Sequence, residues 1–202
     1  MPLGTDATFA VLAGTAVTNA GITHVTGNLG VSPGSSVVGF SPSTGTVAGG
    51  SIYAGDATAA LAQSDLTIAY LNAAARPISG NIGADIGGTT IFPGVWDAPV
   101  SLGVTGTVTL DAQHNPNAVW IFQSPSTLVT STNSAVVLIN GAQSCNVFWQ
   151  VGSSATLNAS SSFYGTILAL SSISLGNGAT VNGRVLARNG AVTLLSNTVT
   201  EP

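Results

Sequence analysis

Three apolar segments near the C-terminal end of the chain repeat at a fixed interval of 18 residues. They occupy residues 148–151, 166–169 and 184–187. Each segment is followed by two more short stretches rich in β-branched residues, and small or polar residues separate the stretches. Three short strands per period are typical of a β-solenoid, in which stacked turns bury a core that a single turn cannot bury.

The same three-strand unit extends through most of the sequence. Residues 9–40 contain weaker copies of it, and residues 90–138 contain two further turns. Residues 41–51 are rich in Gly, Ser, Thr and Pro and are predicted to form a loop. The chain is therefore predicted to be dominated by β-structure and to form one domain over residues 1–202.

Residues 53–75 interrupt the strand pattern with an Ala- and Leu-rich segment. Apolar or small residues recur there at steps of four and three, as on one face of a helix: Ala57, Leu61, Ser64, Ile68, Leu71 and Ala75. Asp56 is a plausible N-cap, and Pro77 prevents the helix from continuing. We predict one helix, at about 53–75, between the N-terminal turns and the main body.

The three strands of each turn give the solenoid three faces, which we number in chain order. On the first face both alternating sets of side chains are apolar, as in residues 119–122, so this face should be covered. The helix is the element available to cover it. We expect the helix to hide Trp96, Trp120 and Trp149.

The second face is predicted to be a flat grid of methyl and hydroxyl groups without charge. Stacked strands repeat at about 4.8 Å, and every second residue of a strand points outward. One predicted outward column is Thr18, Val38, Ser101, Thr127, Thr156, Ser174 and Thr193, and its neighbour is Ala16, Ser36, Ser154, Ser172 and Ala191. The third face is less regular, because Ala135, Val137 and Tyr164 interrupt its outward residues Thr107, Thr109, Thr180, Asn182, Thr198 and Thr200.

Composition argues against several classes of function. Charged residues make up 5% of the 202 residues, and three basic residues form no patch that would suit nucleic acid. No apolar run approaches the roughly 18 residues that cross a bilayer. The sequence shows no predicted metal or cofactor site and no nucleotide-binding motif, and Cys145 is expected to be a buried structural residue.

An enzyme on this scaffold would need paired carboxylates or a metal cluster. The seven acidic residues do not repeat on one face, and His24 and His114 stand alone, so no catalytic activity is predicted. A carbohydrate-binding or adhesive module is the alternative, and it would need exposed aromatic rings, of which Tyr164 is the one candidate. Any single Thr is explained by strand propensity; the absence of charge over two whole faces is what favours a binding surface.

Several longer segments resemble the microbial ice-binding (antifreeze) proteins of the DUF3494 type. The similar segments are residues 9–14, 27–34, 65–70, 92–95, 144–152, 165–169 and 179–184, which together sample nearly the whole chain. The resemblance implies an irregular right-handed β-solenoid with one α-helix packed alongside. It also implies that the N-terminal turns pack beside the C-terminal ones.

The resemblance further implies a secreted protein, expected here to be a monomer, whose partner is the surface of an ice crystal. Its ice-binding residues would correspond to the second face: Ala16, Thr18, Ser36, Ser101, Thr127, Ser154, Thr156, Asn158, Ser172, Ser174, Ala191 and Thr193. Val38 and Val129 stand where related chains often carry Thr. No leader peptide is visible at Met1, which suggests a start that has been cleaved or altered.

Overall fold

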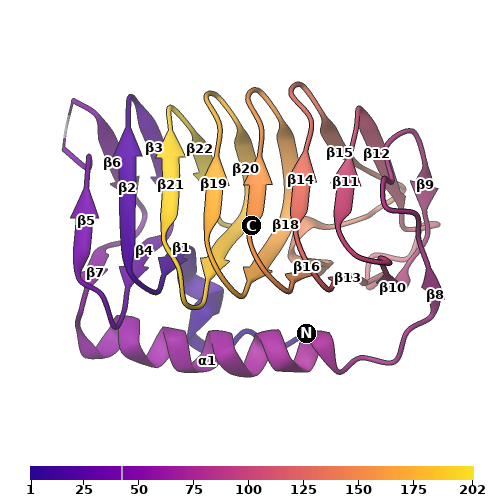
Figure 1. Cartoon of the computed structure of the whole chain (residues 1–202), viewed down its shortest axis with the longest axis horizontal. Helices are drawn as coiled ribbons and strands as arrows, with labels where there is room; N and C mark the ends of the chain where they lie inside the picture. The colour runs from indigo at the N-terminus through magenta and orange to yellow at the C-terminus, as the bar shows by residue number, and fades with distance from the viewer. Residues whose placement is uncertain (42) are drawn as a thin grey trace.

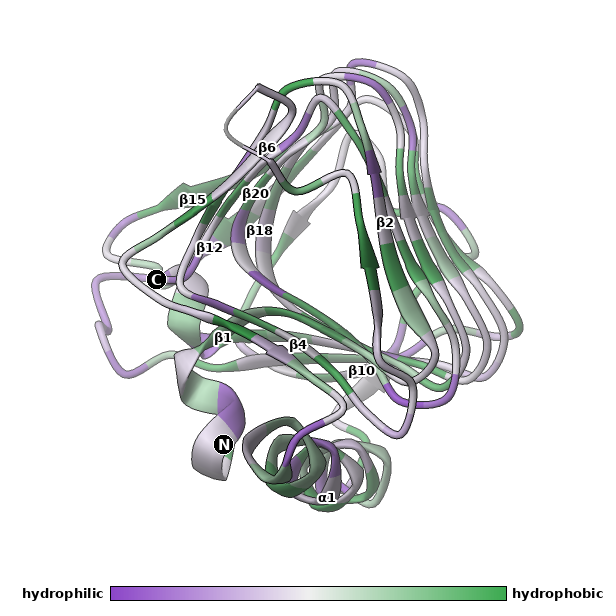
Figure 2. Ribbon diagram, turned by 90° about the vertical axis from the view of Figure 1, so that its left-hand side faces the viewer, coloured by the Kyte–Doolittle hydropathy of each residue, from purple (hydrophilic) through white to green (hydrophobic). Residues whose placement is uncertain are grey.

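The computed structural model describes residues 1–41 and 43–202. These residues wind into a stack of short strands with three sides, and a long helix lies along one side (Figures 1 and 2). The strands form one 15-stranded and one seven-stranded sheet, and neighbouring strands run parallel. The predicted three-faced β-solenoid with a helix alongside is confirmed.

The first face carries the helix. In stacking order its strands are β8 (Gly80–Asn81), β10 (Gly94–Asp97), β13 (Trp120–Ser124), β16 (Val147–Val151), the second halves of β18 (Ser162–Ala169) and β20 (Thr180–Ala187), β1 (Phe9–Ala13), β4 (Asn28–Val31) and β7 (Ile52–Ala54). Strands β13 and β16 are buried at every position, which is why their sequences are apolar on both sides.

The second face is the seven-stranded sheet. In stacking order it contains β11 (Leu102–Val104), β14 (Leu128–Thr130), β17 (Ala155–Leu157), β19 (Ile173–Leu175), β21 (Val192–Leu195), β2 (Ala16–Ala20) and β5 (Ser36–Val38). The third face contains β9 (Thr90–Ile91), β12 (Thr107–Asp111), β15 (Ala135–Ile139), the first halves of β18 and β20, β22 (Thr198–Thr200), β3 (Thr23–Thr26) and β6 (Gly45–Ala48).

Glycines allow β18 and β20 to cross the corner between the third and first faces without a break. Gly165 and Gly183 are paired there, with φ values of 110° and 154°. A Cβ atom on Gly183 would lie 1.9 Å from the carbonyl oxygen of Gly165. Neither the backbone conformation nor the space tolerates a side chain at this corner.

The order of turns along the stack differs from their order along the chain. Strand β1 pairs with both β20 and β4, so Val11 lies beside Val185. Figure 1 shows the consequence, because the indigo N-terminal strands lie next to the yellow C-terminal ones. After β7, helix α1 (Ala57–Ala74) runs the length of the stack, and the chain then returns turn by turn from β8.

The predicted start of the helix is wrong by several residues. Tyr53 belongs to β7, where it pairs with Gly30. The helix begins after Asp56, whose carboxylate accepts a hydrogen bond of 2.9 Å from the backbone N–H of Ala59, as expected of an N-cap. At the other end the buried Gln123 amide donates to the carbonyl oxygens of Ala73 (2.8 Å) and Arg76 (3.1 Å).

The predicted inner face of the helix is also wrong. Leu61, Ile68 and Leu71 are 53%, 65% and 56% exposed. The residues that pack on the first face are Ala59, Ala62, Leu66, Ala69, Tyr70 and Ala73. The helix is apolar on both sides, so periodicity alone does not select a face, and small alanines let the helix approach the sheet closely.

The core has two parts separated by the first sheet. The interior of the solenoid holds Trp120 and Trp149, whose ring stacks on that of Phe122 with 4.1 Å between centroids. The space between sheet and helix holds Ile121 and Phe148. Trp120 and Trp149 are hidden, but by the solenoid itself rather than by the helix as predicted, and Trp96 is only partly buried.

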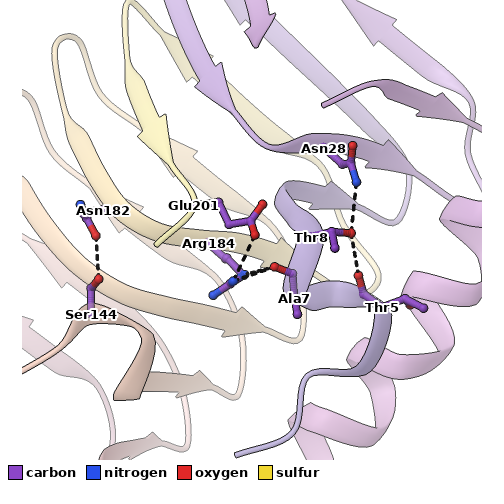
Figure 3. Close-up of polar contacts among 8 residues, drawn as sticks. All are labelled: Thr5, Ala7, Thr8, Asn28, Ser144, Asn182, Arg184 and Glu201. Atoms are coloured by element: carbon purple, nitrogen blue, oxygen red, sulfur yellow. Dashed lines mark hydrogen bonds and ion pairs between the residues drawn. The ribbon is translucent and has the colours of Figure 1, made fainter. Parts of the chain in front are cut away.

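A short 3-10 helix, η1 (Gly4–Thr8), packs beside α1. Its Asp6 carboxyl is fully buried, and no hydrogen-bond partner for either oxygen exists in the described part of the chain. Burial raises the pKa of Asp6 to about 8, with a further contribution from the Asp65 carboxylate. Arg184 lies nearby, donates to the carbonyl oxygen of Ala7 and pairs with Glu201 (Figure 3).

Candidate functional site

The second face presents three outward columns of side chains. Strand pairing aligns the central column on adjacent strands in the order Gly103, Val129, Thr156, Ser174, Thr193, Thr18 and Val38. Figure 2 shows the strands of this sheet overlapping along one side of the triangle, so they lie in one layer. The register of this sheet has no bulge in the described residues, whereas the pairing of β1 with β4 has one.

Two predicted residues belong to a different column from the one expected. Val129 pairs with Thr156, and Leu128 pairs with Ala155 rather than with Leu157. Ser101 and Thr127 therefore lie in the neighbouring column, in line with Ser154, Ser172, Ala191, Ala16 and Ser36. A shift of two residues keeps a side chain on the same face, so both still point outward.

The hydroxyl groups of this neighbouring column are partly engaged within the protein. Thr127 Oγ1 donates to Ser101 Oγ at 3.0 Å. Ser154 Oγ accepts from the backbone N–H of Ser172 at 3.3 Å, and Ser172 Oγ accepts from that of Ala191 at 3.2 Å. These bonds link successive turns and fix the edge of the sheet.

The hydroxyl groups of the central column are free. Thr156, Ser174, Thr193 and Thr18 occupy four adjacent strands, and the described residues offer their hydroxyls no hydrogen-bond partner. At about 4.8 Å per strand, these four groups form a row about 14 Å long. Val129 and Val38, which are both exposed, continue the row at its two ends with methyl groups.

The third column includes residues that sequence reasoning missed. Thr105 and Ser131 lie next to each other there, with 3.3 Å between their hydroxyl oxygens. They were missed because the predicted alignment of β11 and β14 with the other strands was wrong by two residues. Asn158, a predicted site residue, follows β17, and its amide donates to the carbonyl oxygen of Thr130 at 2.7 Å, so it secures the turn.

No charged side chain interrupts the three columns within residues 1–41 and 43–202. Asp85 stands at the end of the sheet, where its backbone bridges to Gly103. Hydrogen bonds from Thr105 and Gly87 lower the pKa of Asp85, so a fixed negative charge marks this end of the face. The three columns themselves carry no charged side chain in the described residues.

The other two faces offer less for a flat partner. The helix covers the first face, and the third face is broken by Tyr164 and by the exposed Val137. Among the described residues, no three His, Cys, Asp or Glu side chains gather in a way that could hold a metal ion. Cys145 is exposed, so the prediction that it is buried is wrong.

In residues 1–41 and 43–202, no helix combines the length and the apolarity that spanning a membrane requires.

Residues 11–200 match the model of a family described as Ice-binding-like. The chain is 47% identical over 199 residues to an ice-binding protein of Nostoc sp. (strain HG1), covering 98% of this chain and 72% of the relative. It is 37% identical over 212 residues to an ice-binding protein of Flavobacterium frigoris (strain PS1), covering 99% and 76%.

Solved structures agree with these sequence matches. The crystal structure of an ice-binding protein from an Antarctic biological consortium superposes with a TM-score of 0.95 at 46% identity, covering 98% of this chain and 90% of that one. That of an ice-binding protein from the ascomycete Antarctomyces psychrotrophicus gives 0.95 at 39% identity, covering 100% and 98%.

Proposed function

We propose that this chain, which belongs to the Ice-binding-like family, binds ice and that the second face is the surface in contact with the crystal. The observation that carries the proposal is the row of four unpartnered hydroxyls on adjacent strands, set in a neutral face. A surface that needed only solubility would carry charged side chains.

The proposed contact depends on preorganisation rather than on strong individual bonds. Each hydroxyl bonds water before docking as well as after it, so the net gain per bond is small. The Thr side chains are stiff at χ1, and the stacked sheet fixes their spacing. Water ordered by such a row needs little rearrangement to join a lattice, so docking loses little further entropy.

The residues proposed to contact ice fall into two groups. The central group is Thr18, Thr156, Ser174 and Thr193. The flanking group is Ala16, Ser36, Ser101, Thr127, Ser154, Asn158, Ser172 and Ala191, together with Thr105 and Ser131. Because the flanking hydroxyls are partly engaged, we assign them the role of holding the edges of the grid in place.

Adsorption through this face would divide a growing crystal surface into curved fronts between bound molecules. Curvature lowers the local freezing point, which gives thermal hysteresis, and it slows the growth of large crystals at the expense of small ones. We further propose that residues 1–202 act as one unit, that the unit works as a monomer, and that it is secreted to meet ice outside the cell.

Substitution on the second face tests this proposal. Thr156→Tyr and Thr193→Tyr place a bulky ring in the central column, and both should abolish most of the thermal hysteresis measured on a single crystal. Thr107→Tyr places the same ring on an exposed strand of the third face and should leave hysteresis unchanged. Full activity in both second-face variants would exclude this face as the contact surface.

The alternative of a carbohydrate-binding module that uses tryptophan rings gains no support. Trp120 and Trp149 are buried in the solenoid interior, and Trp96 is half-buried with its indole N–H bonded to the carbonyl oxygen of Phe92. We propose no catalytic role for the protein, and the described residues place no pair of carboxylates on the second face.

A further inference from the structure

The third face opens between β15 and β18. Strand β15 pairs with β12 at five positions, from Thr107↔Ala135 to Asp111↔Ile139, but it pairs with β18 only at Ala135↔Ser162. Beyond that pair the two strands diverge. The chain then passes through residues 140–146, which include the short 3-10 helix η2 (Ser144–Asn146), before it enters β16.

The divergence leaves a hollow of about 700 Å³ on the surface. Val137 and Leu138 line one side, Ser144 and Cys145 line the overhanging loop, and Tyr164 and Asn182 line the other side. A second hollow of about 190 Å³ lies over β18, β20 and β22, and it shares Ser162, Tyr164 and Asn182 with the first. We call the two together the trough, because their shared residues make them contiguous.

Hydrogen bonds within the protein hold the walls of the trough in place. Ser144 Oγ donates to Asn182 Oδ1 at 2.6 Å, which fastens η2 to β20 (Figure 3). The Trp149 indole N–H donates to the carbonyl oxygen of Tyr164 at 3.0 Å and replaces the strand bond that β15 does not make. The binding surface is thus formed before any ligand arrives.

The trough also carries unused hydrogen-bonding groups around an aromatic ring. Tyr164 is half-buried, and within the described residues neither its hydroxyl, nor that of Ser162, nor the amide nitrogen of Asn182 has a hydrogen-bond partner. The residues that line both hollows include no Asp, Glu, Lys, Arg or His.

We propose that the trough is a binding site for a neutral saccharide. A sugar ring has an apolar face that stacks on an aromatic side chain, and its hydroxyls both donate and accept, as do the groups around Tyr164. The larger hollow is within the range of about 300–1,000 Å³ that small-molecule sites occupy. No charged side chain lines it, so an ionic ligand would find no side chain of opposite charge to compensate for its lost hydration; Pro202, the last residue of the sequence, lies at its rim.

A peptide strand is a poorer occupant. Strand addition needs a row of free backbone groups along a sheet edge. Here one carbonyl of the β18 edge is already bonded to the Trp149 indole, and Ser162 N–H is bonded to the carbonyl oxygen of Ser134. The trough therefore suits side-chain recognition of a polyhydroxylated ligand.

Isothermal titration of the purified protein with maltohexaose, cellohexaose, laminarihexaose and chitohexaose tests the proposal. We expect saturable binding of at least one, and a decrease in affinity of about tenfold or more in Tyr164→Ala, since stacking is lost. Absence of saturable binding to all four, or an unchanged affinity in Tyr164→Ala, would overturn it. So would preferential binding of an uncharged Ser- and Gly-rich hexapeptide.

Chemical modification of Cys145 provides a second test, which is made on the unsubstituted protein. It is the one cysteine of the chain, it is exposed, and it lines the trough. Alkylation of the folded protein with a bulky maleimide should reduce saccharide affinity, whereas the same treatment of Cys145→Ala should leave that variant's affinity at its value before treatment. Equal affinity of alkylated and unmodified protein would count against the site.

These outcomes are separable from those of the ice-binding proposal. Tyr164→Ala should lose saccharide binding and keep thermal hysteresis, whereas Thr156→Tyr should do the reverse. A variant series in which both activities always disappear together would refute the assignment of two sites.

Discussion

Ser174 lies on β19, the middle strand of the seven that form the second face. Six strand spacings of about 4.8 Å make the face about 29 Å long, so a tyrosine at Ser174 stands about 14 Å from either end. A planar crystal surface resting on that ring can touch only one half of the face at a time. Val38 lies on the edge strand β5, where the same ring leaves most of the face accessible.

The expected magnitude follows from this geometry. If the free energy of adsorption is proportional to the number of strands in contact, halving the contact reduces the adsorption constant to about its square root. We expect Ser174→Tyr to lose nearly all thermal hysteresis and Val38→Tyr to keep more than half. Both positions point outward, so the free energy of unfolding should change by less than about 0.5 kcal/mol.

Nanolitre osmometry of the two variants at matched concentration measures the difference, and thermal unfolding followed by circular dichroism checks the fold. Equal losses in Ser174→Tyr and Val38→Tyr would refute the argument from planarity. Greater loss at Val38 would place the contact at the β5 end of the sheet instead.

Three further predictions concern stability. Asp6, whose pKa is raised to about 8, keeps in the folded protein a proton that the unfolded chain releases above about pH 4. The free energy of unfolding should therefore decline from about pH 4 to about pH 8. Thermal melts of Asp6→Asn across this range should show a smaller decline. Gly183→Ala should prevent folding or lower the melting temperature sharply in the same assay. Gly141→Ala is the control, because a Cβ atom there meets nothing within 4 Å, and it should cost only about 1–2 kcal/mol of backbone strain. Gln123→Leu removes the donor to the carbonyls that end α1, and urea titration should show a loss of about 1–3 kcal/mol.

The sequence predicts which side of each strand is buried more reliably than it predicts which residues pair between neighbouring strands. Alternation of apolar and polar residues determines which side of a strand is buried, so Thr156 and Thr193 were correctly expected to point outward. Because alternation repeats every two residues, however, it is the same when a strand is aligned wrongly by two residues, so it cannot reveal such an error. Leu128 aligns with Ala155 although a leucine, Leu157, stands two residues further on.

Long-range features were harder to predict. The separation of β15 from β18 depends on where the loop at residues 140–146 packs, and no local pattern encodes that position. In the sequence Asp6 is an ordinary residue of the N-terminal segment, but the packing of η1 against α1 leaves it fully buried. The role of the second face in ice binding stays a prediction until variants are measured.

The packing of β1 against β20 also constrains how the protein is made. Contacts such as Val11↔Val185 join residues that leave the ribosome far apart in time. In an ordinary solenoid each turn packs on the turn synthesised just before it, so folding can begin at any turn and spread to its neighbours in the chain. Here β1 can pair with β20 only after residues 180–187 have been synthesised, so a nascent chain keeps this edge of β1 open until then.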